Sequence, residues 1–207
     1  MKYLFATLSS DKEESNRLIY DIVRKRDEEI ESMVIFYTPE SKKTIARVKE
    51  DIERVFGIRV DEVEIDAFDI IKSTVAINRY LKGVKNPILF NITLGTVPMT
   101  LSGVIASLYR RDIRILYYDM DKREFDLTGI LKCVAEPPTI IDIIRIIAEN
   151  DEVSYTEIEK KTGLSKASVS KYINKLIDYR LVDIRRQGYG GKTFVRLSET
   201  GKIFSDI

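Results

Sequence analysis

The basic residues of the C-terminal third are grouped in a way that suits nucleic-acid binding. Residues 160–196 contain ten Lys or Arg side chains and only two carboxylates, a local charge of +8 in a chain whose net charge is +1. The remaining residues therefore sum to −7. Clustered positive charge attracts phosphate over long range and is the usual electrostatic footprint of a nucleic-acid-binding domain.

A second group of polar residues lies in two short segments of the N-terminal half. Residues 91–100 read Asn-Ile-Thr-Leu-Gly-Thr-Val-Pro-Met-Thr, and residues 9–11 read Ser-Ser-Asp. Both segments are rich in hydroxyl and small side chains, and both follow apolar runs typical of strands. We treat them as candidates for a ligand site.

Residue types that are missing exclude several functions. The chain has no histidine, which removes the usual neutral-pH general base, Ser–His and Cys–His nucleophiles, and Cys/His zinc sites. No G-x-G-x-x-G follows Leu8 and no G-x-x-x-x-G-K-[ST] occurs, which argues against NAD, FAD and P-loop ATP chemistry. No aspartate cluster indicates bound magnesium. We therefore expect no catalytic residue, no metal and no cofactor, and a protein that is not an enzyme.

The single cysteine, Cys133, rules out an intrachain disulfide and favours the cytoplasm. No apolar run approaches the roughly 18–20 residues of a membrane span. The N-terminus turns polar after about five apolar residues, too short for a secretory signal. We expect a cytoplasmic protein without a membrane partner.

Residues 1–120 alternate short β-branched or aromatic runs with helical periodicity. This alternation predicts an α/β, Rossmann-like domain with a mostly parallel, doubly wound sheet. The expected strands are Tyr3–Leu8, Met33–Thr38, Val60–Asp66, Ile88–Thr93 and Arg114–Asp119, and the expected helices are Asp11–Glu29, Glu40–Phe56, Ala67–Leu81 and Val97–Arg110.

In a sheet of order 3-2-1-4-5, ligands bind beyond the carboxyl ends of the first and fourth strands, where the winding reverses. Both polar segments follow these strands. The alternative for Asn91 and Thr93 is a structural cap at the strand end, and for Met99 it is core packing. The candidate ligand-binding residues are Leu8, Ser9, Ser10, Asn91, Thr93, Leu94, Gly95, Thr96, Val97, Pro98 and Met99.

A domain boundary is expected near Pro137-Pro138, because each proline removes a backbone donor and fixes φ. A short hairpin from Met120 to Leu127 precedes it, and a helix over Thr139–Glu149 follows. The predicted organisation is an α/β domain at 1–128, a linker at 129–137 and a DNA-binding domain at 138–207.

The pattern of residues 154–197 is that of a winged helix-turn-helix. Ser154 and Glu157 have capping-box spacing, and Gly163 is a typical helix stop. A longer helix then runs to Tyr179, followed by two β-like runs around a glycine-rich tip. Double-stranded DNA is the expected partner, although winged helices also serve as protein-interaction modules and basic helix faces are often only solvated. The candidate DNA-binding residues are Ser165, Lys166, Ala167, Ser168, Ser170, Lys171, Asn174, Lys175, Arg185, Arg186 and Lys192.

The segment 91–100 is similar to the N-x-T-G-G-T-x-x-M motif of CRISPR-associated Rossmann-fold (CARF) domains, with Leu94 in place of the first glycine. The whole chain resembles the archaeal regulators that join a CARF domain to a winged helix. The resemblance implies a homodimer formed through the N-terminal domains. It also implies that a cyclic oligoadenylate, typically cyclic tetra-adenylate, binds across the two-fold axis and modulates DNA binding at CRISPR-associated genes.

Two other functions stay open from the sequence. Some CARF domains cleave the cyclic oligoadenylate by attack of a 2′-OH on the adjacent phosphate, and Lys12 is the nearest base to the two segments. The third reading is a winged-helix regulator of an unrelated metabolite.

Overall fold

The computed structural model describes residues 2–9, 13–85, 87–108, 110, 112–119, 121–186 and 193–204. It divides into an N-terminal unit, Met1–Leu127, and a C-terminal unit, Thr128–Ile207. Each unit has its own hydrophobic core.

The N-terminal unit is a six-stranded sheet of order β3-β2-β1-β4-β5-β6. Its first five strands are parallel and β6 runs antiparallel to β5. The reversal of winding between β1 and β4 confirms the predicted Rossmann-like fold. The strands are β1 (Lys2–Leu8), β2 (Ile30–Tyr37), β3 (Arg59–Glu64), β4 (Ile88–Asn91), β5 (Ile113–Tyr118) and β6 (Glu124–Asp126).

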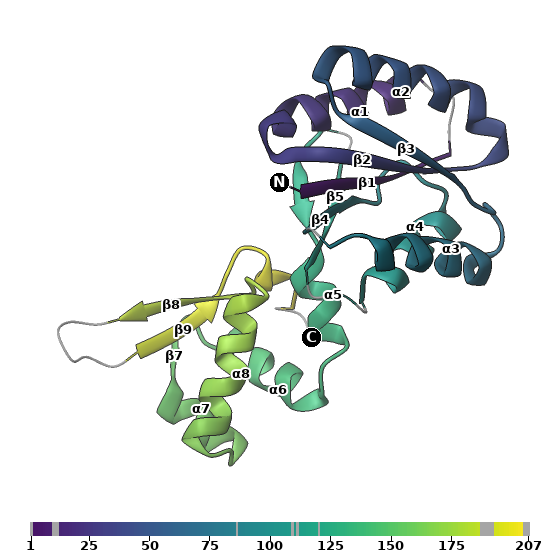
Figure 1. Cartoon of the computed structure of the whole chain (residues 1–207). Coiled ribbons are helices and arrows are strands. Elements are labelled where there is room, and N and C mark those ends of the chain that lie inside the picture. The colour runs from purple at the N-terminus through teal and green to yellow at the C-terminus, as the bar shows by residue number, and fades with distance from the viewer. Residues whose placement is uncertain are drawn as a thin grey trace. The chain divides into compact units, whose positions relative to one another are not determined.

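Two helices cover each face of this sheet, α1 and α2 on one side and α3 and α4 on the other (Figure 1). Side chains alternate between the faces: Leu4, Ala6 and Leu8 of β1 belong to the core under α1 and α2. Phe5 faces the opposite way and stacks edge-on with Phe36 and Phe90. The helices are α1 (Glu13–Arg26), α2 (Lys42–Phe56), α3 (Ile70–Gly83) and α4 (Val97–Leu108), with 3-10 turns at Asp27–Glu29 and Pro39–Ser41.

The segment expected to be a linker, residues 129–137, contains most of a helix instead. Helix α5 spans Thr128–Val134 and belongs to the C-terminal unit. Cys133 is fully buried in that core, and an added Cβ at Gly129 would lie 1.8 Å from the carbonyl oxygen of Tyr179. Only a residue without a side chain fits there, and this close packing turns the expected linker into part of the folded domain.

The C-terminal unit is a winged helix-turn-helix with a three-stranded antiparallel sheet of order β7-β9-β8. The predicted capping box of Ser154 and Glu157 is present, and Gly163 ends the next helix with φ of 70°. Ser165 caps the helix after the turn by accepting from the N–H of Ser168. The elements are α6 (Pro138–Ala148), β7 (Val153–Ser154), α7 (Tyr155–Thr162), α8 (Lys166–Asp178), β8 (Val182–Arg186), β9 (Thr193–Leu197) and the 3-10 turn η3 (Gly201–Phe204).

None of the helices in the described ranges is both long and apolar enough to cross a membrane.

Candidate functional site

The loop between β4 and α4 is shaped by hydrogen bonds from its own polar side chains. The Asn91 side-chain oxygen accepts from the N–H of Thr93 at 3.0 Å. The Thr93 hydroxyl oxygen in turn accepts from the N–H of Tyr118, on β5, at 2.8 Å. Both side chains therefore cap the end of β4, which is the structural role considered as the alternative in the sequence analysis. The other polar atom of the Asn91 side chain, Nδ2, takes no part in this cap.

Thr96 fixes the start of α4. Its hydroxyl accepts from the N–H of Met99 at 3.4 Å and donates to the carbonyl of Ala67 at 3.5 Å. Thr100 donates back to the carbonyl of Ile92 at 3.0 Å. Val97, the first residue of α4, is 74% exposed, so the positive end of the α4 dipole opens to the surface.

The two polar segments meet, as the fold predicted. The N–H of Ser9 donates to the carbonyl of Leu94 at 3.1 Å, and its hydroxyl donates to the same oxygen at 3.3 Å. Gly95 lies against β1, because an added Cβ would come within 2.5 Å of the Thr7 hydroxyl. The Leu94 side chain packs on the core under α1 and α2, which explains a leucine where the CARF motif has glycine.

Three other ligand candidates have different surroundings. Leu8 and Met99 are fully buried, so Met99 has the core-packing role that the sequence left open. Pro98 is partly exposed beside Val97. Ser10 and Lys12 lie outside the described residues.

In and near these loops, several buried polar atoms have no hydrogen-bond partner within the part of the chain that the structure describes. They are the Thr7 hydroxyl on β1, the Asn91 Nδ2 on β4 and the Asn16 Oδ1 on α1. Thr7 is 0% and Asn91 1% exposed. An unsatisfied buried polar atom costs about 1–3 kcal/mol, and a ligand that supplies the missing partner recovers that cost.

An apolar surface, the α3–α4 face, adjoins the loop and was not predicted. Leu101 and Ile105 follow Val97 at intervals of four residues, which places them on one side of α4. The signal was present in the sequence, because residues 97–108 are apolar on all sides of the helix. The α3–α4 face consists of Phe68, Ile71, Val75, Val97, Leu101, Ile105 and Leu108, which are 37–87% exposed.

Helix α8 presents most of the predicted DNA-contacting residues to solvent. Its inner side packs Val169, Ile173 and Leu176 into the core. The outer side is exposed at Ser165, Lys166, Ala167, Lys171 and Asn174, and partly exposed at Ser168 and Ser170. Lys166 and Lys171 form no ion pair with a residue that the structure describes.

Lys175 is in a different situation, which the sequence did not reveal. Its ammonium group lies 2.5 Å from a carboxylate oxygen of Glu136, and the Tyr179 hydroxyl donates to the other oxygen at 2.5 Å. Glu136 lies 39 residues earlier in the chain. Its charge offsets that of Lys175 and anchors the end of α8.

Two arginines on the wing strands form ion pairs. Arg185 lies 3.1 Å from Glu152, and Arg196 lies 3.7 Å from Asp183. Both arginines are more than half exposed. Solvent therefore screens these ion pairs, and DNA phosphate can compete with the carboxylates for the arginine side chains. Arg186 ends β8, and Lys192 lies outside the described residues.

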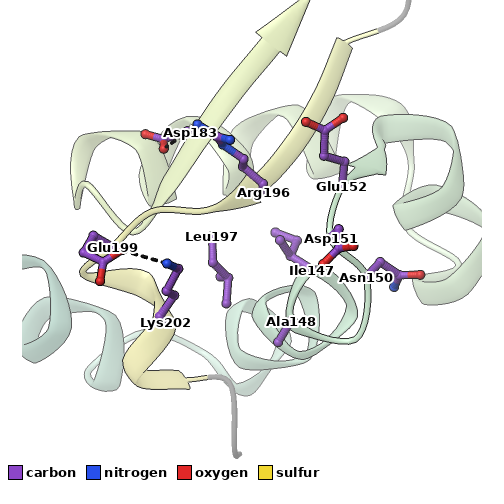
Figure 2. A pocket seen from close by; sticks show the side chains of 10 residues that line it. All are labelled: Ile147, Ala148, Asn150, Asp151, Glu152, Asp183, Arg196, Leu197, Glu199 and Lys202. Atoms are coloured by element: carbon purple, nitrogen blue, oxygen red, sulfur yellow. Dashed lines mark hydrogen bonds and ion pairs between the residues drawn. The ribbon is translucent and has the colours of Figure 1, made fainter.

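A hollow of about 670 Å³ lies on the C-terminal unit between the end of α6, the wing strands and η3. Figure 2 shows its lining, with Lys202 paired to Glu199 and Arg196 to Asp183. Asp151 and Glu152 leave it with an excess of negative charge. This excess disfavours DNA phosphate, so the DNA-binding surface is better sought on α8 and the wing.

Two further groups bear on chemistry. Burial raises the pKa of the Cys133 thiol to about 11, with a smaller contribution from Glu136, so this thiol stays protonated near neutral pH. Among the described residues, no group of three or more Cys, Asp or Glu side chains is placed to hold a metal ion.

The fold and the exposed helix define a protein that joins a Rossmann-like domain to a winged helix. Residues 14–125, more than half of the chain, match the family model of the Csa3 CRISPR-associated Rossmann-like domain. The chain therefore belongs to this family. Residues 137–192 match the MarR family of winged helices, and the combination is that of a transcription regulator.

Solved structures with weaker similarity span either the whole chain or its C-terminal part. Can2 from Sulfobacillus thermosulfidooxidans, in complex with cyclic tetra-adenylate, is 14% identical over 99% of this chain and 64% of its own, with a TM-score of 0.47. Adhesin competence repressor (AdcR) from Streptococcus pyogenes is 20% identical over 34% of this chain and 51% of its own, with a TM-score of 0.32. HlyU from Vibrio cholerae is 24% identical over 37% of this chain and 80% of its own, with a TM-score of 0.33. The chain thus spans about half of AdcR and less than two thirds of Can2. No curated protein matches it.

Proposed function

We propose that the protein is a ligand-responsive transcription regulator of CRISPR-associated genes. In this proposal a cyclic oligoadenylate, with cyclic tetra-adenylate as the expected ring, binds the N-terminal unit and modulates DNA binding by the winged helix. The observation that carries the proposal is the set of buried polar atoms without a partner among the described residues beside an open helix N-terminus, at the carboxyl edge where the winding of the sheet reverses between β1 and β4.

The β1 and β4 loops suit a phosphate-bearing ligand. Backbone N–H groups at the start of α4 favour an anion. Ser9, Thr93 and Thr96 are partly exposed. The Thr93 hydroxyl accepts from Tyr118 and keeps its hydrogen to donate to a phosphate or ribose oxygen, whereas the Ser9 and Thr96 hydroxyls would exchange their bonds to the Leu94 and Ala67 carbonyls for such an oxygen. Neutral donors of this type hold a phosphate without a buried countercharge, whose burial would be costly.

The α3–α4 face supports a homodimer formed through the N-terminal units. Exposed apolar side chains in a row on two adjacent helices are typical of protein interfaces, and a second copy would bury them by two-fold symmetry. Because Val97 belongs both to this face and to the mouth of the loop, such a dimer brings two sites near the symmetry axis. This arrangement accommodates a cyclic ligand that is itself symmetric.

The winged helix supports double-stranded DNA as the partner of the C-terminal unit. Lys166, Lys171 and Asn174 lie on the exposed side of α8, which enters the major groove in this class of domain. The wing arginines contact the phosphate backbone in this arrangement. In a dimer the spacing of the two α8 helices must match two half-sites, so ligand-driven changes of spacing alter affinity, typically by 1–3 kcal/mol.

We also propose that the protein binds the cyclic oligoadenylate without cleaving it. The described residues of the two loops have neutral side chains, so none of them offers a cation or general base for attack by the ribose 2′-OH. Incubation of the protein with cyclic tetra-adenylate, followed by chromatography, should recover the intact ring. Linear products that accumulate with protein concentration would assign a ring nuclease instead.

Isothermal titration of the full chain with a panel of cyclic oligoadenylates tests the proposed ligand. Saturable binding of one ring size, with DNA affinity that changes when the ring is added, is the expected result. A chain that binds DNA but none of the rings would be a regulator of another metabolite.

A further inference from the structure

Asn16 of α1 has a buried side-chain oxygen without a partner among the described residues, and the sequence did not mark it as a ligand residue. It is the fourth residue of α1, so it lies in the turn next to the β1 loop. Ile19 and Val23 follow it by three and seven residues and are fully buried in the core under α1. This spacing places Asn16 on the side of α1 that faces the sheet.

Asn91 lies on the same face of the sheet. Leu89, two residues earlier on β4, belongs to the core under α1, and side chains two apart on a strand share a face. Asn91 is also the last residue of β4, at the carboxyl edge from which α1 begins. The two asparagines are therefore brought to one face and one edge of the sheet.

The hydrogen bonds of Asn91 fix which of its atoms is unpaired. Its oxygen accepts from the N–H of Thr93, which leaves the amide nitrogen, a donor, without a partner. The unpaired atom of Asn16 is the oxygen, an acceptor. The edge thus offers one buried acceptor and one buried donor on the same side of the sheet.

An adenine base has the complementary pair of groups. Its N6 amino group donates, and the adjacent ring nitrogen, N7 on one edge or N1 on the other, accepts. Hypoxanthine has a carbonyl in place of the amino group and so cannot donate at that position. On the N7 edge hypoxanthine has only the acceptors O6 and N7, so a pattern at Asn16 and Asn91 that matches this edge distinguishes the two bases.

We propose that Asn16 and Asn91 together read an adenine of the bound ligand. The Asn16 oxygen accepts from the N6 amino group, and the Asn91 amide nitrogen donates to N7. This role deepens the proposed function, on which it rests, because it explains why the ring is built of adenylate rather than of another nucleotide.

The first test compares two ligands on the unmodified full chain. Isothermal titration with cyclic tetra-adenylate and with cyclic tetra-inosinate should give an affinity at least about tenfold lower for the inosinate ring, the size of one lost base contact. Equal affinity for the two rings would overturn the proposal. Absence of binding to either ring would remove the proposed function together with it.

The second test uses Asn16→Leu, which keeps most of the side-chain volume and removes the polar atom. We expect this variant to bind cyclic tetra-adenylate about tenfold more weakly. Its thermal midpoint should be equal to or above that of the unmodified chain, because an unsatisfied buried atom has gone. Its discrimination between the adenylate and inosinate rings should also shrink.

Thr74→Val supplies the matched control. The Thr74 hydroxyl is likewise buried without a partner, but it lies on α3, on the opposite face of the sheet. This variant should bind cyclic tetra-adenylate as the unmodified chain does. If Asn16→Leu also bound the ring with unchanged affinity, the Asn16 oxygen would have no part in reading the base.

Discussion

Replacement of Gly95 by alanine tests the packing on which the ligand loop depends. The added Cβ would lie 2.5 Å from the hydroxyl oxygen and 2.8 Å from the Cβ of Thr7, and 3.1 Å from the Cβ of Met99. A rotation of Thr7 about χ1 moves its hydroxyl and its methyl group but not its Cβ. Because the two Cβ atoms are attached directly to the backbone, the loop or β1 has to shift by some tenths of an ångström.

The cost of such overpacking is typically 1–3 kcal/mol, and we expect Gly95→Ala to lower the free energy of unfolding of the N-terminal unit by about this amount. The first turn of α4 moves with the loop, so the affinity for cyclic tetra-adenylate should fall as well. Thr7→Ala removes the nearest contact, so the double variant should recover part of the lost stability.

Urea denaturation followed by circular dichroism measures the change in stability, and isothermal titration measures the ligand affinity. Gly83→Ala is the matched control, because an added Cβ there meets no atom within 4 Å and alanine favours a helix by roughly 0.5–1 kcal/mol over glycine. It should leave stability unchanged or slightly raised. A Gly95→Ala variant as stable as Gly83→Ala would refute the close approach of the loop to β1.

Three further predictions concern DNA binding, assembly and pH. The double variant Lys166→Ala/Lys171→Ala should weaken DNA binding, measured by fluorescence anisotropy. It should also lower the slope of log affinity against log salt by about 1 per lost phosphate contact. The control Lys42→Ala/Lys43→Ala on α2 removes the same charge and should leave that slope unchanged. Leu101→Glu, on the α3–α4 face, should shift sedimentation from dimer to monomer, whereas Val55→Glu on α2, also at an exposed apolar position, should remain dimeric. Burial alone would raise the pKa of Glu124, but hydrogen bonds from Arg26 and Tyr118 lower this pKa below its usual 4.5. The ionised carboxylate therefore stabilises the fold above pH 4.5, and this contribution is lost as the pH falls through the folded-state pKa. Urea midpoints of Glu124→Gln and the unmodified chain should accordingly differ at pH 7 and converge on acidification, and a constant difference would contradict this origin.

Much of the fold was predictable because local pattern and tertiary structure agree. The apolar runs near Phe5, Ile35 and Phe90 became buried parallel strands, and the serine and glycine signals around Ser154 and Gly163 bounded α7 as expected. Such features depend on residues a few positions apart, which is the range over which sequence reasoning is strong.

The linker expected at 129–137 depended on the proline pair alone, and the structure has most of helix α5 in that segment. Pro137-Pro138 marks only the start of α6. The preceding residues belong to the folded unit through the burial of Cys133 in its core and the close approach of Gly129 to the Tyr179 carbonyl. That contact joins residues fifty positions apart, and no local pattern reveals it.

The sequence predicted where in the fold the candidate site lies better than it predicted which atoms of its side chains are free to bind a ligand. The sequence placed the Ser9 and Leu94 segments at one edge, where the structure joins them. It did not distinguish the bonded oxygen of Asn91 from its unpaired nitrogen, nor the exposed Lys171 from the anchored Lys175, because both distinctions depend on partners from other elements. Asn16 did leave a signal, as a polar residue in the apolar stripe that continues through Ile19 and Val23.

Titration of the full chain with cyclic tetra-adenylate tests the central claim most directly. We expect saturable binding of one ring per two chains, as a site shared across a two-fold axis requires, and a weaker signal from the Gly95→Ala variant. If the folded, DNA-binding chain gave no binding to the ring, the assignment of the β1–β4 edge as a cyclic oligoadenylate site would be contradicted.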